Sequence, residues 1–481
     1  MQVLSGLQPE AVFRYFEEIS SIPRSSGNRK PISDYCVAFA KQRGLACWQD
    51  DACNVIIKKP ASPGYEDAAP VVFQGHLDMV AEKLPGSKFN FETDGLHLQV
   101  CGDWISADGT TLGGDNGIAV AFGLALLDDP TLCHPSLEVL LTTDEEIGML
   151  GAVGLDASPL EGHILLNMDS EAEGVFTVSC AGGASASCRL PVSELPCGQP
   201  SLTITVGGLA GGHSGIEIGE GRGNANVLLG RVLDAVMGEV PLRLVTLDGG
   251  GKDNAIASFA QAVVALPSDC REKAAAAVAS AAALLKNEYA AADPGLTVSV
   301  SEGETAPCAM SAEDTVRCIR FLLLAPNGVQ EMSRDIPGLV QTSLNLGILK
   351  AGAGEMRTVH SVRSSIGSQK TMLLRRLEEL TRMLGGTMDV AGDYPAWEYR
   401  KESPLRDLMV QVYREQQGKE PVVEAIHAGL ECGILCGKLP GLDCVSYGPD
   451  LMEIHTPRER MSISSVQRLW EFTIEVLRRS K

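Results

Sequence analysis

The sequence predicts an α/β protein whose mostly parallel sheet, with helices on both faces, is interrupted by an inserted α+β domain. Short, fully apolar runs alternate with helical segments over residues 1–186. The segment 187–396 instead contains strands in which apolar and polar residues alternate, and the first pattern returns over 397–481. We therefore expect one α/β domain built from the two ends of the chain and a second domain inserted between them.

The first part of the α/β domain is predicted from apolar periodicity. Helical spacing appears over 9–19 and 31–43, and "NGIAVAFGLALLDD" at 116–129 is an apolar helix. Short apolar runs between the helices are typical of buried parallel strands, and they lie at 54–59, 71–76, 137–142, 163–169 and 174–180.

The inserted domain is predicted to be an antiparallel sheet with helices on one face. Runs such as "SLTITVGGL" and "LTVSVSEG" alternate as half-exposed strands do. The spacing also indicates two related halves, 200–290 and 296–394, each with the order strand, helix, strand, strand, helix. The helices are expected at 224–238, 270–290, 311–324 and 368–384.

The α/β pattern resumes after residue 397. A helix is expected at 404–417, a strand at 421–427, a short helix, a strand at 442–449 and an amphipathic helix at 464–479.

Composition excludes several classes of protein. The chain has 481 residues, enough for two or three domains, and a net charge of −21, which argues against a nucleic-acid partner. No apolar run approaches the roughly 20 residues of a membrane span. None of the 14 cysteines falls in a CxxC pair, and the N-terminus lacks a signal-peptide pattern. We expect a cytoplasmic protein without a membrane partner, with Cys432 and Cys436 a helical core pair rather than metal ligands.

Three consecutive carboxylates in "TTDEEIG" (142–148) follow the apolar strand "LEVLL" directly. Acidic side chains at the end of a buried strand cost free energy unless something compensates their charge. Successive side chains of an extended chain point to opposite sides. Glu145 and Glu146 are therefore expected to face different partners, while Asp144 is expected to be structural and to cap the following turn.

Four further places combine polar side chains with strand ends or loops. His76 ends the strand at 71–76, and Asp78 lies two residues on, where a carboxylate can orient a metal-bound imidazole. Asp115 lies in the glycine-rich "DGTTLGGDNG" before an apolar helix, where a helix cap is the alternative. Asp169 follows another strand, and His455 follows the strand at 442–449. Each is weak alone, because polar strand ends and loop histidines are common.

Together these residues indicate a mixed nitrogen and oxygen site at one edge of a parallel sheet. Imidazole with carboxylate favours zinc, manganese or cobalt over magnesium or calcium. The carboxylates outnumber those that one tetrahedral ion needs, so the pattern favours two ions about 3.5–4 Å apart, bridged by one carboxylate.

The order of these motifs resembles the aminoacyl-histidine dipeptidases, PepD-type cytosolic enzymes of the di-zinc exopeptidase and carnosinase clan. The resemblance covers essentially the whole chain. The motifs that carry it are "GHLDMV", "TTLGGDNG", "TTDEEIGMLGAVGL", "NMDSEAEG", "CAGG", "GGHSG", "GNANVLLGR", "HAGLECG" and "HTP". It implies a zinc-exopeptidase-like catalytic domain at 1–186 and 397–481, with the insertion at 187–396 as a lid.

The resemblance also implies a role for each site residue. Two Zn²⁺ ions, with Mn²⁺ or Co²⁺ as substitutes, would share Asp115. One ion would be bound by His76, Asp115 and Asp169, and the other by Asp115, Glu146 and His455. Glu145 would be the general base, Asp78 would orient His76, and His213 of "GGHSG" would stabilise the oxyanion.

Substrate contacts are carried over on looser motifs. Asn254 and Arg363 resemble lid residues that hold the substrate carboxylate, and Glu431 of "HAGLECG" is placed near the metals as a further substrate-binding residue. Read without the resemblance, Asn254 is a turn residue, Arg363 is an exposed strand residue and His213 is a solvated residue of a glycine-rich turn.

The function implied is hydrolysis of dipeptides, Xaa-His and β-alanyl-histidine included. A water shared by the two ions would attack the peptide carbonyl while Glu145 accepts its proton. Two alternatives are an N-acyl amino acid amidohydrolase of the same clan and a non-catalytic metal- or peptide-binding protein; "HAGLECG" and the large lid argue against the first, and the intact Glu145 against the second. We expect a small peptide substrate and a homodimer, with His213 acting in its own chain or in its neighbour.

Overall fold

The computed structural model describes residues 3–481, and their contacts divide the chain into two units. The first unit contains residues 3–180, 399–425 and 430–481, and the second contains residues 181–398 and 426–429. The second unit thus begins six residues before the predicted boundary at 187. It also takes in the short segment 426–429, which the sequence did not suggest.

An eight-stranded sheet forms the centre of the first unit, in the order β1-β2-β6-β3-β7-β21-β8-β20. The four strands β6, β3, β7 and β21 run parallel, whereas β1, β2 and β8 pair antiparallel with their neighbours. The strands are β1 (Ala46–Gln49), β2 (Val55–Lys59), β3 (Val71–His76), β6 (Leu137–Thr142), β7 (Ile164–Asn167), β8 (Val175–Cys180), β20 (Val422–Ile426) and β21 (Asp443–Ser446).

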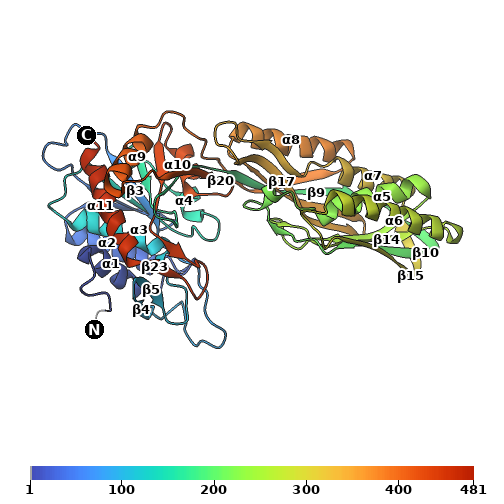
Figure 1. Ribbon diagram of the computed structural model, residues 1–481, viewed down its shortest axis with the longest axis horizontal. Helices are drawn as coiled ribbons and strands as arrows, with labels where there is room; N and C mark the ends of the chain where they lie inside the picture. Colours follow the sequence, from blue (N-terminus) through green and yellow to red (C-terminus); the bar gives the residue numbers. More distant parts are fainter. Residues whose placement is uncertain (1–2) are drawn as a thin grey trace. The chain divides into compact units, whose positions relative to one another are not determined.

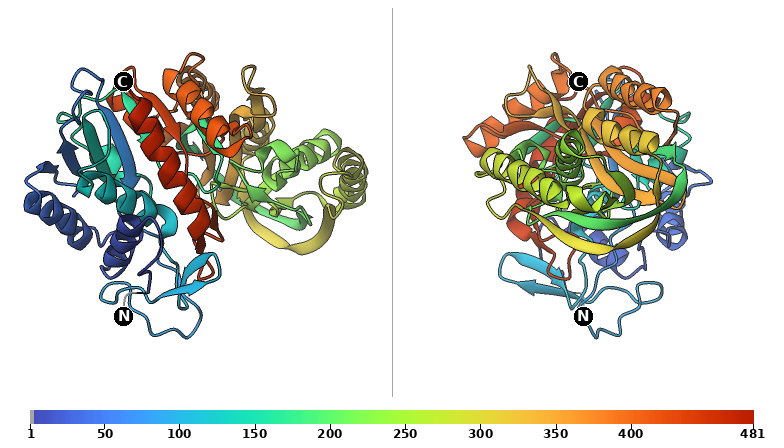
Figure 2. Two further views of the ribbon diagram at one scale, coloured as in Figure 1. Left: turned by 60° about the vertical axis from the view of Figure 1, so that its left-hand side comes forward. Right: turned by 90° about the vertical axis from the view of Figure 1, so that its right-hand side faces the viewer.

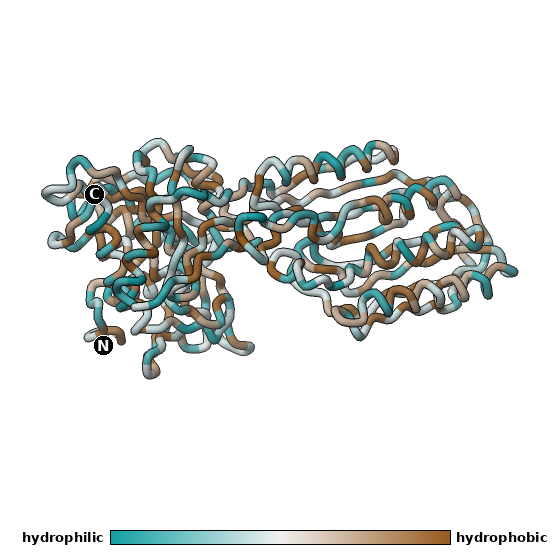
Figure 3. Tube along the Cα trace, turned by 45° about the horizontal axis from the view of Figure 1, so that its top comes forward, coloured by the Kyte–Doolittle hydropathy of each residue, from teal (hydrophilic) through white to brown (hydrophobic). Residues whose placement is uncertain are grey.

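Helices cover both faces of this sheet, as the sequence predicts (Figure 1). Phe73 and Val139 point into the core that α3 covers, whereas Cys444 of β21 faces Cys432 of α10 on the other side. Figure 3 shows the hydrophobic stretches gathered in the middle of the unit. The helices are α1 (Glu10–Ser20), α2 (Lys30–Gln42), α3 (Gly114–Asp128), α4 (Leu150–Gly154), α9 (Pro404–Gln417), α10 (Glu431–Lys438) and α11 (Ile463–Arg479).

A small antiparallel sheet joins two distant parts of the same unit. Its strands are β4 (Leu98–Cys101), β5 (Trp104–Ala107), β22 (Leu451–Met452) and β23 (Arg460–Ser462), in the order β22-β23-β5-β4. Arg460 pairs with Ser106 and Ser462 with Trp104. The loop after β5 and the loop between β22 and β23 therefore leave the sheet side by side.

The second unit contains a nine-stranded sheet whose pairs are antiparallel. Its order is β15-β10-β14-β12-β17-β18-β9-β19, with β16 also paired to β17. The strands are β9 (Gly182–Pro191), β10 (Glu194–Gly207), β12 (Arg243–Gly249), β14 (Ala260–Ala265), β15 (Thr297–Met310), β16 (Gly328–Met332), β17 (Val340–Gly352), β18 (Glu355–Ser364) and β19 (Thr387–Tyr394).

Four helices pack along this sheet, and Figure 2 shows them as a layer beside the curved strands. They are α5 (Ala225–Glu239), α6 (Arg271–Glu288), α7 (Ala312–Leu324) and α8 (Gly367–Met383). The predicted order strand, helix, strand, strand, helix occurs twice, in β10-α5-β12-β14-α6 and β15-α7-β17-β18-α8, when the short strands β11 and β13 and the additional strand β16 are set aside. The short pair β11 (Gly212–His213) and β13 (Ala255–Ile256) and the 3₁₀ turns Ile218–Glu220 and Ser268–Cys270 complete the unit.

Among residues 3–481, no helix combines the length and the apolar character that a bilayer span requires.

Candidate metal centre

The carboxyl ends of three neighbouring parallel strands bring the predicted site residues together. Strand β3 ends at His76, β6 ends at Thr142 just before the three carboxylates, and β7 ends at Asn167 just before Asp169. Strand β3 lies between β6 and β7, and its last residue, His76, is paired in register with Thr142, the last residue of β6. Ligand sites in open parallel sheets lie at this edge, and these strands supply three of the five predicted metal ligands.

Asp115 lies between two sets of ligands. Its Oδ1 is 3.3 Å from His76 Nε2, which is itself 3.5 Å from Asp169 Oδ1. Its Oδ2 is 3.1 Å from His455 Nε2, and that nitrogen is 3.1 Å from Glu146 Oε2. One carboxylate therefore presents one oxygen to each of the two ligand sets that the sequence predicts.

The helix-cap alternative for Asp115 is wrong. Helix α3 begins at Gly114, its N-cap residue is Gly113, and no side chain caps it. Asp115 and Asn116 have non-helical backbone angles. The side chain of Asn116 links the ligands around it, because its Oδ1 accepts from the backbone N–H of His76 (3.0 Å) and its Nδ2 donates to Asp169 Oδ1 (3.0 Å).

Asp78 is buried beside His76, as its predicted role requires. His76 Nδ1 is hydrogen-bonded to the backbone carbonyl oxygen of Asp78 at 3.1 Å and lies 3.4 Å from Asp78 Oδ1. This carboxylate oxygen also accepts from the backbone N–H of Glu145 at 3.0 Å. Asp78 Oδ2 accepts from the backbone N–H of Glu146 at 3.3 Å and from Ser26 Oγ at 2.7 Å. Asp78 can therefore orient the imidazole and also holds the turn that carries both glutamates.

The three consecutive carboxylates have different surroundings. Glu146 faces His455 through Oε2, and its buried Oε1 has no hydrogen-bond partner. No hydrogen bond is recorded for the largely buried Glu145 carboxylate, although its backbone is held by Asp78. Asp144 does not cap the following turn: it accepts from the backbone N–H of Gly27 at 2.7 Å and pairs with Arg29. Its structural role thus consists of tying β6 to the segment before α2.

Mutual charge dominates the electrostatics of the centre. Burial alone would lower the pKa of His76, but Asp115, Asp169 and Asp78 raise it well above its ordinary value. Hydrogen bonds to Asp115 and Glu146 raise the pKa of His455 to about 10. Burial raises the pKa of Asp169, against the opposing effect of His76. The carboxylates therefore need more positive charge than two imidazoles supply.

Glu145 has a raised pKa for a different reason. Burial is the largest cause; the positive charge of His76 opposes it, and the carboxylates of Asp169, Glu431 and Glu146 reinforce it. A carboxyl group with a raised pKa is a better proton acceptor than an ordinary one, as a general base must be.

Glu431 is fully buried in the first unit, at the start of α10. Its Oε2 accepts from Gln74 Nε2 and from Thr142 Oγ1, both at 2.6 Å, and its Oε1 has no partner. Burial raises the pKa of this carboxyl to about 7. Glu431 thus lies beneath the strand ends and touches β3 and β6. Its contact with a substrate remains a prediction.

The remaining predicted residues all lie in the second unit. His213 is in β11, and its Nδ1 accepts from the backbone N–H groups of Gly215 and Ile216, both at 3.2 Å. The backbone carbonyl oxygen of Asn254 accepts from the backbone N–H of Ser214, the residue that follows His213. Arg363 of β18 donates to Tyr394 at 3.4 Å, and its buried Nε has no partner.

Sequence reasoning missed three residues that support the centre. Asn116 stands next to Asp115, so the motif "GGDNG" contained the signal. Glu459 and Arg24 are buried charged residues that bond the backbone around Asp115. Glu459 lies two residues after the motif "HTP" (455–457), whereas "SIPRSSG" around Arg24 offers no signal.

The donor set fits a pair of cations. Ligand atoms of His76, Asp115 and Glu146 lie within 4.8 Å of one another, and Glu146 keeps an orphaned buried oxygen. Imidazole nitrogens with carboxylate oxygens suit zinc, manganese or cobalt.

Comparison with known proteins places the chain in a family. The model of peptidase family M20/M25/M40 matches residues 72–479. The chain belongs to this family. It is therefore an enzyme, a metallopeptidase.

Two relatives resemble the chain over its full length. The cytosol non-specific dipeptidase of Escherichia coli (strain K12) is 38% identical over 480 residues, covering 99% of each chain. The crystal structure of aminoacylhistidine dipeptidase from Vibrio alginolyticus is 37% identical, with a TM-score of 0.94 over 98% of this chain and 97% of the other. Aminopeptidase PepT from Bacillus cereus ATCC 10987, 15% identical, has a TM-score of 0.55 over 98% and 99% of the two chains and shares the fold.

Glu146 and Glu145 should differ when each is replaced by glutamine. We expect Glu146→Gln to weaken binding of one metal equivalent by about 10-fold or more, because it loses a charged ligand. Glu145→Gln should keep the metal affinity near that of the wild type and lose peptide turnover. Metal titration of the apoprotein with a competing chelator measures both affinities. Equal metal loss in the two variants would refute the division of roles.

Proposed function

We propose that this metallopeptidase hydrolyses dipeptides with a free carboxylate, Xaa-His and β-alanyl-histidine among them, using two zinc ions. The observation that carries the proposal is the placement of Asp115 between His76 with Asp169 on one side and His455 with Glu146 on the other. The names of the two full-length relatives, a non-specific dipeptidase and an aminoacylhistidine dipeptidase, support the substrate class.

Metal ions in this centre would supply a Lewis acid and lower the pKa of a water. His76, Asp115 and Asp169 would hold one ion, and Asp115, Glu146 and His455 the other. Mn²⁺ or Co²⁺ can replace Zn²⁺ in such a donor set.

Glu145 moves the proton in the proposed reaction. It accepts a proton from the attacking water and delivers it to the leaving amine. Two features support this role: the buried Glu145 carboxylate has a raised pKa, and its backbone is fixed by Asp78. Asp78 and Asn116 keep the imidazole of His76 in place during this step.

His213 is proposed to donate a hydrogen bond to the oxyanion. Its Nδ1 accepts two backbone N–H groups, so a neutral ring carries its proton on Nε2. Burial, followed by the charge of Arg363, lowers the pKa of His213. A neutral ring with a fixed Nε2–H is a ready donor.

Arg363 and Asn254 are proposed to bind the substrate carboxylate. The unpartnered Nε of Arg363 supports this role, because a guanidinium binds carboxylate through paired N–H groups. Burial is the larger cause of the lowered pKa of both His213 and His427, and the positive charge of Arg363 lowers both further. The pKa of His427 is lowered to about 4. Asn254 adjoins the turn of His213 through its carbonyl oxygen.

A substrate panel tests the activity. We expect the zinc-loaded enzyme to hydrolyse Gly-His and β-alanyl-histidine and to leave N-acetyl-histidine intact, because peptide and acyl substrates differ at the free amine. Release of histidine, followed by amine derivatisation and chromatography, measures all three. Faster hydrolysis of the N-acetyl compound would favour the amidohydrolase alternative, and no turnover of any of them would contradict the proposal.

Replacement of Arg363 tests the carboxylate contact. We expect Arg363→Met to raise KM for Gly-His by about 10-fold or more, the cost of a lost charge-assisted contact. The variant should hydrolyse Gly-histidinamide about as the wild type does, since the amide has no carboxylate to bind. Arg357→Met, at an exposed position of the same strand, is the matched control. Equal losses on both substrates would contradict the assignment.

We also propose a cytoplasmic location. All 14 cysteines are free thiols within the described residues, as in proteins of reducing compartments.

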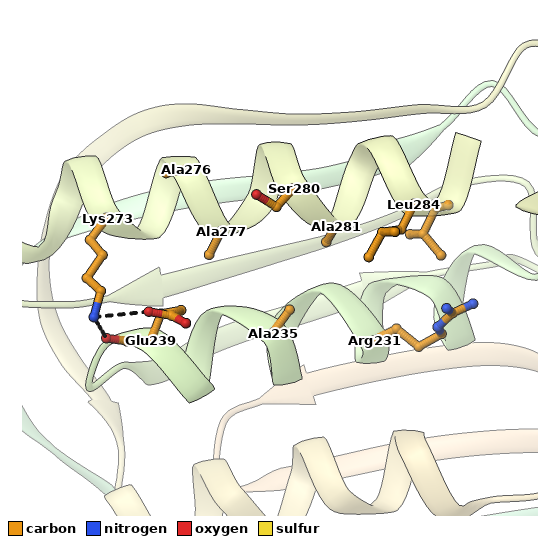
Figure 4. Close-up of a pocket in the computed structure, with 10 residues that line it drawn as sticks. Arg231, Ala235, Glu239, Lys273, Ala276, Ala277, Ser280, Ala281 and Leu284 are labelled. Atoms are coloured by element: carbon orange, nitrogen blue, oxygen red, sulfur yellow. Dashed lines mark hydrogen bonds and ion pairs between the residues drawn. The ribbon is translucent and has the colours of Figure 1, made fainter. Parts of the chain in front are cut away.

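A homodimer is proposed through the outer face of α5 and α6. Ala276, Ser280 and Leu284 of α6 and Ala235 of α5 line a groove there, and Leu284 is 65% exposed (Figure 4). Ion pairs close both ends of the groove, Lys273 with Glu239 and Arg231 with Glu288. A face of small residues with acidic and basic side chains at its ends can pack against the same face of a second chain in a two-fold dimer.

Sedimentation measures the assembly state directly. We expect a dimer mass for the wild type, and a monomer after Ala276→Glu with Leu284→Glu, because two-fold packing would oppose like charges. Gln411→Glu on α9 of the first unit is the control. A monomeric wild type would contradict the proposal.

A further inference from the structure

The loop between β22 and β23 is connected to the loop that carries Asp115 by one buried carboxylate, that of Glu459. Glu459 is 2% exposed and lies four residues after His455. Its Oε2 accepts from the N–H groups of Leu112 (2.8 Å) and Gly113 (3.0 Å). Its Oε1 accepts from those of Gly114 (2.8 Å) and Asp115 (3.3 Å). Four consecutive backbone donors therefore converge on one side chain.

The glycines of "TTLGGDNG" make this approach possible. Gly113 has φ +63°, which disfavours a side chain, and a Cβ there would lie 2.5 Å from Arg24 Nη2. A Cβ on Gly114 would lie 3.0 Å from Leu451 and 3.3 Å from Glu459 Oε1. The glycine pattern is thus explained by contacts with Glu459 and Arg24.

Arg24 connects the same loop to the other ligand loop. Its Nη2 donates to the carbonyl of Gly113 at 2.6 Å, and its Nη1 donates to those of Leu77 (3.1 Å) and Asp78 (3.4 Å). Since both residues are buried, neither can bind a substrate directly. The three loops that supply His76, Asp115 and His455 are therefore joined by two buried charged side chains.

We propose that Glu459 is a positioning residue for the two-cation centre. It fixes the Asp115 carboxylate between the two ligand sets and ties that carboxylate to the loop of His455. The inference rests on the proposed metal-dependent function. Its physical basis is that residues outside the ligand set, by orienting the ligands, typically change metal affinity by about 10–100-fold.

Carboxylate chemistry explains why glutamine should fail at this position. Both oxygens of Glu459 accept, and each receives two N–H groups. The side-chain NH₂ of glutamine is a donor, so it would face two backbone donors without an acceptor. The loop at 112–115 would then move away, and Asp115 would move with it.

Metal titration of variants tests the proposal. The apoproteins of the wild type, Glu459→Gln and Glu453→Gln are titrated with Zn²⁺ against a chromogenic chelator. Glu453 is the matched control, because it is an exposed carboxylate of the same loop, paired with Arg458. We expect zinc affinity to fall about 10-fold or more in Glu459→Gln, and to stay within about two-fold in Glu453→Gln.

Kinetics at saturating zinc separate positioning from general damage. For Glu459→Gln we expect the zinc concentration for half-maximal activity to rise about 10-fold or more, while kcat at excess zinc returns to within a few-fold of the wild type. If Glu459→Gln does not fold by circular dichroism, Glu459→Asp replaces it, since it keeps the charge but is too short to reach all four amides. Zinc affinity of the folded variant within two-fold of the wild type overturns the proposal. Failure of the wild type to bind zinc would instead overturn the proposed function.

Discussion

The crowding of negative charge at the carboxyl ends of β6, β3 and β7 is the constraint on which the rest of this molecule depends. Asp115, Glu146 and Asp169 converge there with two imidazoles. Buried like charges are tolerated only when cations or protons compensate them. The pKa of His455 is raised by its hydrogen bonds to Asp115 and Glu146, and the pKa of Asp169 is raised by burial, so both groups favour a proton in this crowded centre. Metal ions, on which this peptidase family depends, would supply the positive charge that these groups lack.

The three adjacent carboxylates that follow β6 have different surroundings and therefore different roles. The Glu146 carboxylate faces His455, whereas the Glu145 carboxylate makes no hydrogen bond within the described residues and has a raised pKa. Both depend on Asp78, which accepts their backbone N–H groups and also contacts His76. Asp144 stabilises the turn from the other side through Gly27 and Arg29. A ligand and a proton carrier can therefore be neighbours without exchanging roles.

The sequence predicted those parts of the fold and the site that depend on local patterns. Strand β6 was expected at 137–142 and is found there, because its apolar run ends where the polar residues begin. Four of the five ligand candidates could be proposed because each lies at or just after the end of a strand or in a glycine-rich loop, whereas His455 was proposed from its place in a loop near the last strands. The partners of Asp144 and the function of Glu459 were not predictable, since Arg29 and Leu112 lie 115 and 347 residues away from them. A carboxylate that binds backbone amides leaves no periodic signal.

The mixed sheet shows the same limit. The parallel core β6-β3-β7-β21 follows from apolar runs between helices, but the antiparallel strands β2 and β8 were not distinguished from it. The edge strand β1 was not predicted. Likewise, the segment 426–429 joins the second unit through contacts such as Ser343 Oγ with His427 Nε2 at 2.7 Å. Both the strand directions and the membership of 426–429 in the second unit depend on contacts between distant segments, which the local sequence pattern of one segment cannot predict.

The pairing of β5 with β23 also determines when the centre can form during synthesis. Strand β5 is synthesised long before β22, β23, His455 and Glu459, because these follow it by several hundred residues. A nascent chain that already contains His76, Asp115 and Asp169 still lacks His455 and the Glu459 carboxylate that binds the amides of residues 112–115. The complete set of candidate ligands therefore exists only once residue 455 has been synthesised, and a product truncated before that residue has an incomplete centre.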